Sequence, residues 1–527
     1  MRSPDDGGSG RASVPPAPPA AEPPASAPPP PPARPARRRA GLLVGLAAVL
    51  VLALAAAGVV LVKPGPVAGW LGQAEPTPTA STDPPEPAPG EVLAVFGTGA
   101  VTPTPDGLRA VLDPLVGVDV LGPSVHVAVV DVATRELLYG RDPQTPTVPA
   151  STTKLITAAT VLATRGPAYR IPTRVVAGAA PGEVVLVGGG DPTLAINATG
   201  SYPGAGRLDQ LAAQVKQALG GVAPTRVTVD SSLFPKPLYG PGWDPDIPTG
   251  GFASPITALM TDGARIDPKD TVKGATRYEN PDVAAGRAFA RALGLPAAVV
   301  SAVTRGSAPA GTSPAGTSAP PADATASPDT ATATNPGTEL GRVESPPMGR
   351  LVEFMLADSD NVVAEALARQ VALARNQPAS FDGAAAAMDA VVAELKLAAD
   401  QSTLSDGSGL SRNNRISPEL LTDVLALAAD GTRPELAGIF AGLPVAGWSG
   451  TLSERFGNQT ASAAVGVVRA KTGTLTGVHA IAGVVTTTQG RLLAFAVLAD
   501  QVPVGLEQAQ PPLDRIAAAL ATCGCGS

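Results

Sequence analysis

The pattern of apolar and polar positions first marks one long uncharged segment. No charged residue occurs from 40 to 62, and three consecutive arginines, 37–39, come directly before this run. About 20 apolar residues suffice for a helix to span a bilayer, and positive charge beside the span stays in the cytoplasm. We therefore expect a disordered cytoplasmic tail at 1–39, a single-pass transmembrane anchor at 40–62 and everything after Lys63 outside the cytoplasm, on the cell-wall side.

A cleaved signal peptide is the alternative interpretation of the same run. The apolar region of a signal peptide normally has about 7–15 residues and is shorter than this one. The small residues at 55–58 could still be a cleavage site. Both interpretations leave the bulk of the chain outside the cytoplasm. Residues 63–90 are rich in proline and predict a semi-extended linker.

Regular patterns begin after this linker. A period of two predicts a β-hairpin at 125–130 and 136–139, and apolar positions at helical spacing predict a buried helix that begins at Ser151. The second half of the chain predicts a helix at 349–374 broken at 358–360, helices at 380–398 and 417–430, strands at 465–475, 478–488 and 491–500, and a terminal helix at 513–522. Five strands from the two ends of the chain would share one sheet.

The middle of the chain has a different pattern. Between 171 and 300, several short strand patterns accompany helical patterns at 207–219 and 283–293. Residues 306–337 are of low complexity and predict a disordered loop. We therefore expect an inserted β-rich domain at 176–345, which interrupts a core domain made of 91–175 and 346–527.

Composition and charge exclude some classes of protein. The formal net charge of −7 offers no broad basic surface, which argues against a nucleic-acid partner. Cys523 and Cys525 cannot form a zinc site by themselves, and the glycine-rich residues 188–191 lack the lysine of a phosphate-binding loop. We therefore expect no metal and no cofactor. The two thiols either form a disulfide or stay idle, and the sequence leaves both open.

Ser151 and Lys154 are a candidate nucleophile and base. A spacing of i, i+3 puts both side chains on one face of a helix. A serine hydroxyl needs a base, and a lysine can act as one when burial or a cationic neighbour lowers its pKa. The alternative is a helix-capping serine beside a surface lysine. Against that alternative, none of the chain's other lysines has a serine three positions before it.

Lys471, Thr472, Gly473 and Thr474 form a second candidate group, within a strand pattern. A lysine and two hydroxyls suit a substrate carboxylate, and a glycine lets a ligand backbone approach closely. Because consecutive residues of a regular strand point to opposite faces, we expect a twist or bulge near Gly473. The alternative is an ordinary strand that ends in a polar turn.

Ser359 and Asn361 form the third candidate group, on either side of Asp360. Ser, Asp and Asn are all good helix caps, so a structural cap is the alternative. A competing S-x-N triplet occurs at 411–413, in a loop pattern. We prefer Ser359 and Asn361 because a helix start holds its side chains rigidly.

The order of the three motifs is more specific than any one of them. S-x-x-K and S-x-N at helix starts, followed by K-T-G on a strand, form the signature of β-lactamases and penicillin-binding proteins. A Ser-His-Asp triad would need His126 or His479, and both lie in apolar strand patterns. The sequence therefore predicts a serine enzyme that uses lysine as its base.

Over roughly residues 92–522 the chain resembles the D-alanyl-D-alanine carboxypeptidase/endopeptidase family, the class C low-molecular-mass penicillin-binding proteins. The resemblance is carried by PASTTKLIT (149–157), GGGDPTL (188–194), VDSSLF (229–234), YGPGW (239–243), SPPM (345–348), SDNVVAEAL (359–367), DGSGLSR (406–412), GWSGTL (447–452) and KTGTL (471–475). It implies an α/β (α+β) fold of the penicillin-binding, β-lactamase-like type, with a five-stranded antiparallel sheet flanked by helices. The low-complexity loop departs from the family pattern.

The resemblance also implies the chemistry at the nucleophile. Ser151 would attack the carbonyl of the D-Ala-D-Ala bond in peptidoglycan stem peptides, and Lys154 would accept its proton. Ser359 would relay a proton to the leaving amine, near Lys471. Water would then release the acyl-enzyme, and β-lactams would trap the same serine as covalent inhibitors.

Substrate binding follows from the same resemblance. Asn361 would hold a substrate amide, and Lys471, Thr472 and Thr474 would hold the terminal carboxylate. The backbone N–H groups of Ser151 and Thr474 would form the oxyanion hole. Two other functions stay open at this point: a non-catalytic wall-binding or β-lactam-sensing protein, and a β-lactamase or esterase on the same fold.

Overall fold

The computed structural model describes residues 100–270, 274–310 and 335–525. The tail, anchor and linker predicted at 1–90 lie outside these residues, as does most of the predicted loop at 306–337. Within the described ranges, no helix has both the length and the apolar character that crossing a bilayer requires. The chain divides after Gly90 into two units, and the elements below all belong to the second, Glu91–Ser527.

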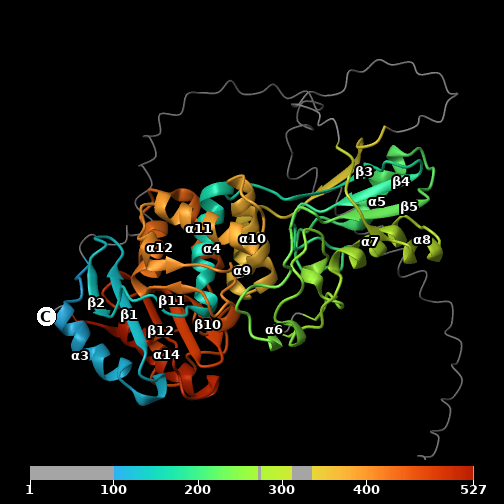
Figure 1. Cartoon of the computed structure of the whole chain (residues 1–527). Helices are drawn as coiled ribbons and strands as arrows, with labels where there is room; N and C mark the ends of the chain where they lie inside the picture. Colours follow the sequence, from blue (N-terminus) through green and yellow to red (C-terminus); the bar gives the residue numbers. More distant parts are fainter. Residues whose placement is uncertain (1–99, 271–273, 311–334, 526–527) are drawn as a thin grey trace, which may run out of the picture. The chain divides into compact units, whose positions relative to one another are not determined.

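The core sheet unites strands from the two ends of this unit (Figure 1). Its order is β10-β11-β12-β1-β2, and every neighbouring pair is antiparallel. The strands are β1 (Val125–Asp131), β2 (Leu137–Arg141), β10 (Val468–Leu475), β11 (Val478–Thr486) and β12 (Leu492–Ala499). The five-stranded antiparallel sheet and both predicted hairpins are therefore confirmed.

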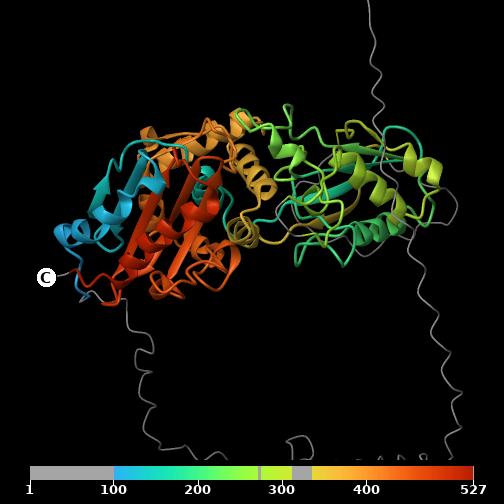
Figure 2. The same cartoon turned by 90° about the horizontal axis from the view of Figure 1, so that it is seen from below.

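Helices cover both faces of this sheet, because alternate strand residues are apolar on each side. On one face, Ala480 and Ala482 belong to a core shared with α4 (Lys154–Arg165) and α12 (Pro418–Ala429). On the other face, Ile481 packs in a core shared with α3 (Pro105–Val116) and α14 (Leu506–Thr522). Figures 1 and 2 show these helices on opposite sides of the sheet.

The helical patterns are confirmed, with two differences at the ends of the chain. The helical group consists of α4, α9 (Met348–Ala357), α10 (Asn361–Ala374), α11 (Phe381–Glu394), α12 and the short α13 (Gly438–Gly442). Helix α14 begins before Pro511 and Pro512, whereas the pattern predicted its start behind them because proline usually ends a helix. Burial of Ala509 and Pro512 in the core offsets this cost. Helix α3, capped by Thr104, was not predicted.

The inserted region has its own sheet, in the order β6-β5-β4-β3-β7. Its strands are β3 (Pro172–Ala177), β4 (Glu183–Val187), β5 (Arg226–Asp230), β6 (Thr304–Arg305) and β7 (Glu339–Glu344). The β4–β5 and β5–β6 pairs are parallel, and parallel neighbours need crossovers, which here carry helices. These are α5 (Leu208–Ala218), α7 (Pro281–Ala292) and α8 (Ala297–Ser301), with the single turn α6 (Asp246–Thr249) between them. The expectation of a β-rich insert is therefore corrected to an α/β one.

Small elements complete the core. The two-residue strands β8 (Ser402–Thr403) and β9 (Arg415–Ile416) pair with each other and bracket the loop that contains DGSGLSR. At the C-terminus, Cys523 and Cys525 form a disulfide, which decides between the two alternatives left open by the sequence. The carbonyl of Cys525 accepts hydrogen bonds from the backbone N–H and the hydroxyl of Thr104, and these bonds tie Cys525 to the start of α3.

Candidate active site

Ser151 lies in a tight turn in front of α4 rather than inside the helix. Ala150–Thr153 form one 3-10 turn, and α4 begins at Lys154. Ala150, directly before the serine, has a φ of 47°, a backbone conformation that costs energy in any residue other than glycine. The turn therefore presents Ser151 in a strained, fixed position, and its side chain lines the cleft described below.

The amine of Lys154 lies next to the hydroxyl of Ser151. Its Nζ is 3.0 Å from Ser151 Oγ, 2.7 Å from Asn361 Oδ1 and 2.6 Å from the carbonyl oxygen of Ser408. The lysine side chain is fully buried. A lysine in this setting is held by fixed oxygen atoms instead of water, so its amine has a defined direction relative to the serine.

The SDN segment occupies the break between α9 and α10, and it serves both as a cap and as part of the site. Asp360 is the N-cap of α10, and its Oδ1 accepts hydrogen bonds from the N–H groups of Val362 and Val363. Ser359 has a φ of 56°, and its Oγ accepts a hydrogen bond of 2.9 Å from Lys471 Nζ. This segment therefore caps α10 and also brings a hydroxyl to Lys471.

The charge of Asp360 is held by groups from the insert. Its Oδ2 accepts from Arg265, at 2.9 Å, and from the hydroxyl of Tyr202, at 2.7 Å. Burial alone would raise the pKa of Asp360, but the guanidinium groups of Arg265 and Arg277 outweigh burial and hold that pKa well below its usual range. The helix cap therefore stays ionised at all ordinary pH values.

The competing triplet at 411–413 has a structural role. Ser411 Oγ donates to the carbonyl of Pro241, at 2.6 Å, and Arg412 forms a two-pronged ion pair with Asp244. These contacts join the loop to the insert. The structure brings Ser359 and Asn361, rather than Ser411 and Asn413, to the two lysines.

Strand β10 brings its residues to the site without a break in its register. The β10–β11 pairing is continuous, so the bulge, one of the two alternatives expected near Gly473, is wrong. Because β10 is an edge strand, the long side chain of Lys471 reaches Ser359 while Thr472 and Thr474 line the cleft themselves. Gly473 is needed for close packing, since a Cβ there would lie 2.7 Å from the carbonyl oxygen of Pro149.

The edge of β10 that faces away from β11 also carries backbone donors. Ala470 donates its N–H to the carbonyl of Pro444, at 3.0 Å, and therefore points away from β11. N–H directions alternate along a strand, so the N–H of Thr474 points to the same edge. The turn that contains Ser151 packs against this strand. The backbone N–H groups of that turn are therefore a second source of donors near the N–H of Thr474.

These elements surround one cleft of about 400 Å³. Ser151, Ser359, Asn361, Thr472 and Thr474 all contribute to its lining. The sequence did not predict the other contributors, which include Asp244, Ile247, Phe252, Arg265, Thr451, Arg455 and Gln510. Thr451, whose Oγ1 is 3.0 Å from Thr472 Oγ1, belongs to the GWSGTL stretch, which was a signal that could have identified it.

The two histidines lie apart from this cleft, whose lining includes neither of them. His126 is on β1 and contacts Ser124 Oγ through Nε2, at 3.1 Å. His479 is buried on β11, where burial and the nearby Arg455 lower its pKa. Both are therefore strand histidines, and Ser151 has a lysine beside it instead.

Comparisons with known proteins identify a family and several relatives. The model of the D-Ala-D-Ala carboxypeptidase 3 (S13) family matches residues 109–293 and 324–520. Carboxypeptidase Rv3627c of Mycobacterium tuberculosis is 39% identical over 444 residues, which cover 82% of this chain and 87% of that protein. Carboxypeptidase DacB of Mycolicibacterium smegmatis is 35% identical over 457 residues, which cover 85% and 92% of the two chains.

Solved structures show the same fold. The crystal structure of penicillin binding protein 4 (DacB) from Haemophilus influenzae matches with a TM-score of 0.59 and 22% identity, over 79% of this chain and 98% of that one. The family match spans most of the chain, including the turn with Ser151 and the strand with Lys471. The chain therefore belongs to the D-Ala-D-Ala carboxypeptidase 3 (S13) family and is a serine-type peptidase.

Proposed function

We propose that this protein cleaves the D-Ala-D-Ala bond of peptidoglycan stem peptides, as a carboxypeptidase, an endopeptidase or both, through an acyl-enzyme on Ser151. The observation that carries this proposal is the buried amine of Lys154, 3.0 Å from Ser151 Oγ. Family membership supports the class of reaction. The contacts within the site support the assignment of roles to residues.

The surroundings of Lys154 suit a general base. Asn361 Oδ1 and the carbonyl of Ser408 accept hydrogen bonds from the amine, and neither oxygen can donate in return. A neutral amine that gives its two hydrogens to these oxygens points its lone pair at the Ser151 hydroxyl. Lys154 then takes the hydroxyl proton while Oγ forms a bond to the substrate carbonyl carbon.

Collapse of the tetrahedral intermediate needs an acid near the leaving amine. Ser359 lies on the cleft, with Lys471 Nζ 2.9 Å from its Oγ. Ser359 can pass a proton to the departing D-alanine nitrogen and regain one from a neighbouring ammonium. The carbonyl–nitrogen bond then breaks, D-alanine leaves, and the acyl group stays on Ser151 until water hydrolyses the ester.

The edge of β10 suits the charged parts of the substrate. Thr472 and Thr474 offer hydroxyls beside the Lys471 ammonium, a set that fits the terminal carboxylate. The N–H groups of Ser151 and Thr474 would bind the oxyanion. One N–H of the Asn361 amide donates to the carbonyl of Phe252, at 3.0 Å; an amide has two N–H bonds, and the second can bind a substrate carbonyl.

β-Lactams would act as covalent inhibitors because they place a strained amide at the same position. Penicillin binding protein 4 of Haemophilus influenzae, which shares the fold, has been solved in complex with a β-lactam. In this chain, the β-lactam carbonyl carbon would bond to Ser151 Oγ. The opened ring would then stay attached, because its deacylation is slow.

The test combines labelling and product analysis. Wild-type protein should take up a fluorescent penicillin, and Ser151→Ala should take up none. Digestion of purified muropeptides should release D-alanine if carboxypeptidase action occurs and separate cross-linked pairs if endopeptidase action occurs. Unlabelled wild-type protein, or undiminished label on Ser151→Ala, would contradict the acyl-enzyme. Rapid, sustained penicillin turnover would favour a β-lactamase instead.

A further inference from the structure

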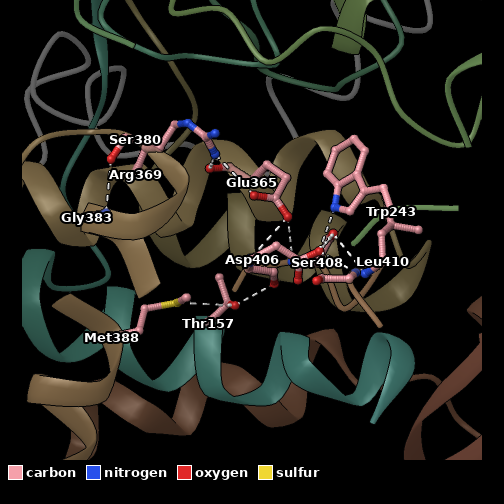
Figure 3. Close-up of polar contacts among 12 residues, drawn as sticks. Thr157, Trp243, Glu365, Arg369, Ser380, Gly383, Met388, Asp406, Ser408 and Leu410 are labelled. Carbon is pink, nitrogen blue, oxygen red and sulfur yellow. Dashed lines mark hydrogen bonds and ion pairs between the residues drawn. The ribbon is translucent and has the colours of Figure 1, made fainter. Parts of the chain in front are cut away.

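The loop that contains DGSGL enters the proposed chemistry only through the carbonyl of Ser408, which accepts a hydrogen bond from Lys154. Figure 3 shows this loop between two helices, one carrying Glu365 and the other carrying Thr157. These helices are α10 and α4, and α4 begins at Lys154. The loop is buried: Asp406 and Ser408 have almost no exposed surface. A buried polar loop between two helices needs a partner for each of its backbone groups.

Asp406 gathers the donors of this loop. Its Oδ1 accepts from the N–H of Gly409, at 2.8 Å, and from the Asn414 amide, at 2.6 Å. Its Oδ2 accepts from the N–H of Ser411, at 2.7 Å, and from the indole N–H of Trp243, at 2.8 Å. All of these groups donate, so both oxygens of the Asp406 carboxylate act as acceptors. If an amide replaced the carboxylate, its NH2 group would point at groups that are themselves donors.

One peptide unit links Asp406 to the lysine. The N–H of Gly409 and the carbonyl of Ser408 belong to the same planar peptide group, and they point in opposite directions. The N–H meets Asp406, and the carbonyl oxygen lies 2.6 Å from Lys154 Nζ. Fixing one end of a rigid plane fixes the other. The carboxylate also polarises the peptide, which makes its carbonyl a stronger acceptor.

The preceding peptide unit is held in the same manner. The N–H of Ser408 donates to Glu365 Oε1, at 2.8 Å, and the carbonyl of Gly407 accepts from Thr157 Oγ1, at 2.6 Å. Gly409 adopts a φ of 83°, and a Cβ there would lie 1.8 Å from the carbonyl oxygen of Ala150. The loop therefore fits tightly against the residue that precedes the nucleophile.

We propose that Asp406 is a positioning residue for the catalytic lysine: by holding the 408–409 peptide, it aims the Ser408 carbonyl at Lys154 and so directs the lysine lone pair toward Ser151. This inference rests on the proposed acyl-enzyme. The carbonyl takes one hydrogen of the amine and Asn361 takes the other. Without the fixed carbonyl, the amine rotates and its lone pair faces the hydroxyl for only part of the time.

The test separates acylation from binding. Rapid-mixing kinetics with a fluorescent penicillin give a dissociation constant for the initial complex and a rate constant for acylation at saturation. Asp406→Asn should lower the acylation rate constant about 100-fold, the scale expected for a misplaced catalytic group, and leave the dissociation constant unchanged. A purely structural role would not produce this split.

The control is Asp389→Asn. Asp389 is a carboxylate on α11 that accepts from Ser402 Oγ, at 3.0 Å, and burial raises its pKa to about 6. This variant also loses a shielded carboxylate, but it lies outside the 406–409 loop and should leave both constants unchanged. An equal fall in acylation for Asp389→Asn would show that loss of stability is responsible, and would overturn the inference.

A second variant covers the case in which Asp406→Asn does not fold. Trp243→Phe keeps an aromatic ring against Phe381, whose centroid is 5.6 Å from that of Trp243, while it removes the indole donor to Asp406 together with part of the ring. It should give a smaller fall in the acylation rate constant alone. Unchanged acylation in both variants would overturn the positioning role while the acyl-enzyme stands. Absence of label on the wild type would overturn the acyl-enzyme itself.

Discussion

Two residues at the site hold backbone conformations that most residues avoid. Ala150 and Ser359 have φ values of 47° and 56°, a region that costs roughly 1–2 kcal/mol for a residue with a side chain. One precedes the nucleophile and the other supplies the hydroxyl bonded to Lys471. Such strain persists only where surrounding contacts enforce it. These two strained positions therefore help to fix the hydroxyl groups of Ser151 and Ser359, at a cost in folding free energy.

Replacing Ser359 separates its backbone strain from its hydroxyl. Ser359→Gly and Ser359→Ala both remove the contact with Lys471 Nζ, so both should acylate more slowly. Only glycine relieves the positive φ, so Ser359→Gly should be about 1 kcal/mol more stable than Ser359→Ala. Urea unfolding of the two variants measures this difference. An alanine variant as stable as the glycine variant would mean that the backbone relaxes without cost.

At the scale of elements, α10 joins the site to the core through one face. Asn361, Glu365 and Arg369 follow one another at a spacing of four residues, which stacks them along the helix. Asn361 contacts Lys154, Glu365 holds the 407–408 N–H groups, and Arg369 pairs with Glu365 at 3.1 Å. The Arg369 guanidinium contacts the ring faces of Phe234 and Phe381. Helix α10 therefore carries a row of polar side chains from the cleft into the interior.

Glu365, the middle residue of this row, makes the free energy of unfolding depend on pH. Burial and the nearby Asp406 raise the pKa of Glu365 to about 7, with Arg369 opposing them. Because the folded chain holds this proton more tightly than the unfolded chain, the contribution is fully present below about pH 4.5 and is lost as the pH rises through about 7. The loss corresponds to about 3 kcal/mol for a shift of this size.

Glu365→Gln should remove this dependence. The difference in unfolding free energy between the wild type and the variant should fall steadily between about pH 4.5 and 7. Denaturant unfolding across that range measures it. The comparison with the variant is needed because Asp191 and Asp423, whose pKa values burial also raises to about 6, contribute in the same direction in both proteins. A constant difference would contradict the shifted pKa.

At the scale of the whole molecule, the insert and the core build the site jointly. The insert region supplies Trp243 to Asp406, Asp244 to Arg412 and Arg265 to Asp360. Each contact reaches a residue next to a catalytic candidate or its supporting loop. The insert is therefore part of the active centre and not only an appendage to it.

A proposal about localisation concerns the other end of the chain. We propose that residues 40–62 anchor the protein in the cell membrane with the peptidase outside the cytoplasm. The full chain, expressed in a bacterium, should stay with membranes after alkaline extraction and keep its N-terminus by mass spectrometry. A chain that lacks 1–62 should not stay with membranes. A shortened, extractable product of the full chain would indicate a cleaved signal peptide instead.

Most secondary structure could be predicted from the sequence, because apolar periodicity reports which face of an element is buried. The hairpins of the core sheet and helices α4, α10 and α12 follow such patterns. The start of α14 could not, because its prolines oppose helix formation and only core packing overcomes them. The bulge expected at Gly473 was wrong, since Lys471 does not line the cleft itself and instead reaches Ser359 from the other face of a regular strand.

By itself, the sequence predicted the class of chemistry: three short motifs, in one order, indicate a candidate serine nucleophile, a candidate lysine base and the residues beside them. Tertiary structure decided which of two S-x-N triplets meets the lysines, and how Lys154 is aimed. These outcomes depend on contacts between residues hundreds of positions apart, such as that of Lys154 with Ser408. No local pattern encodes such contacts, because they arise only when separate helices, strands and loops pack into one core.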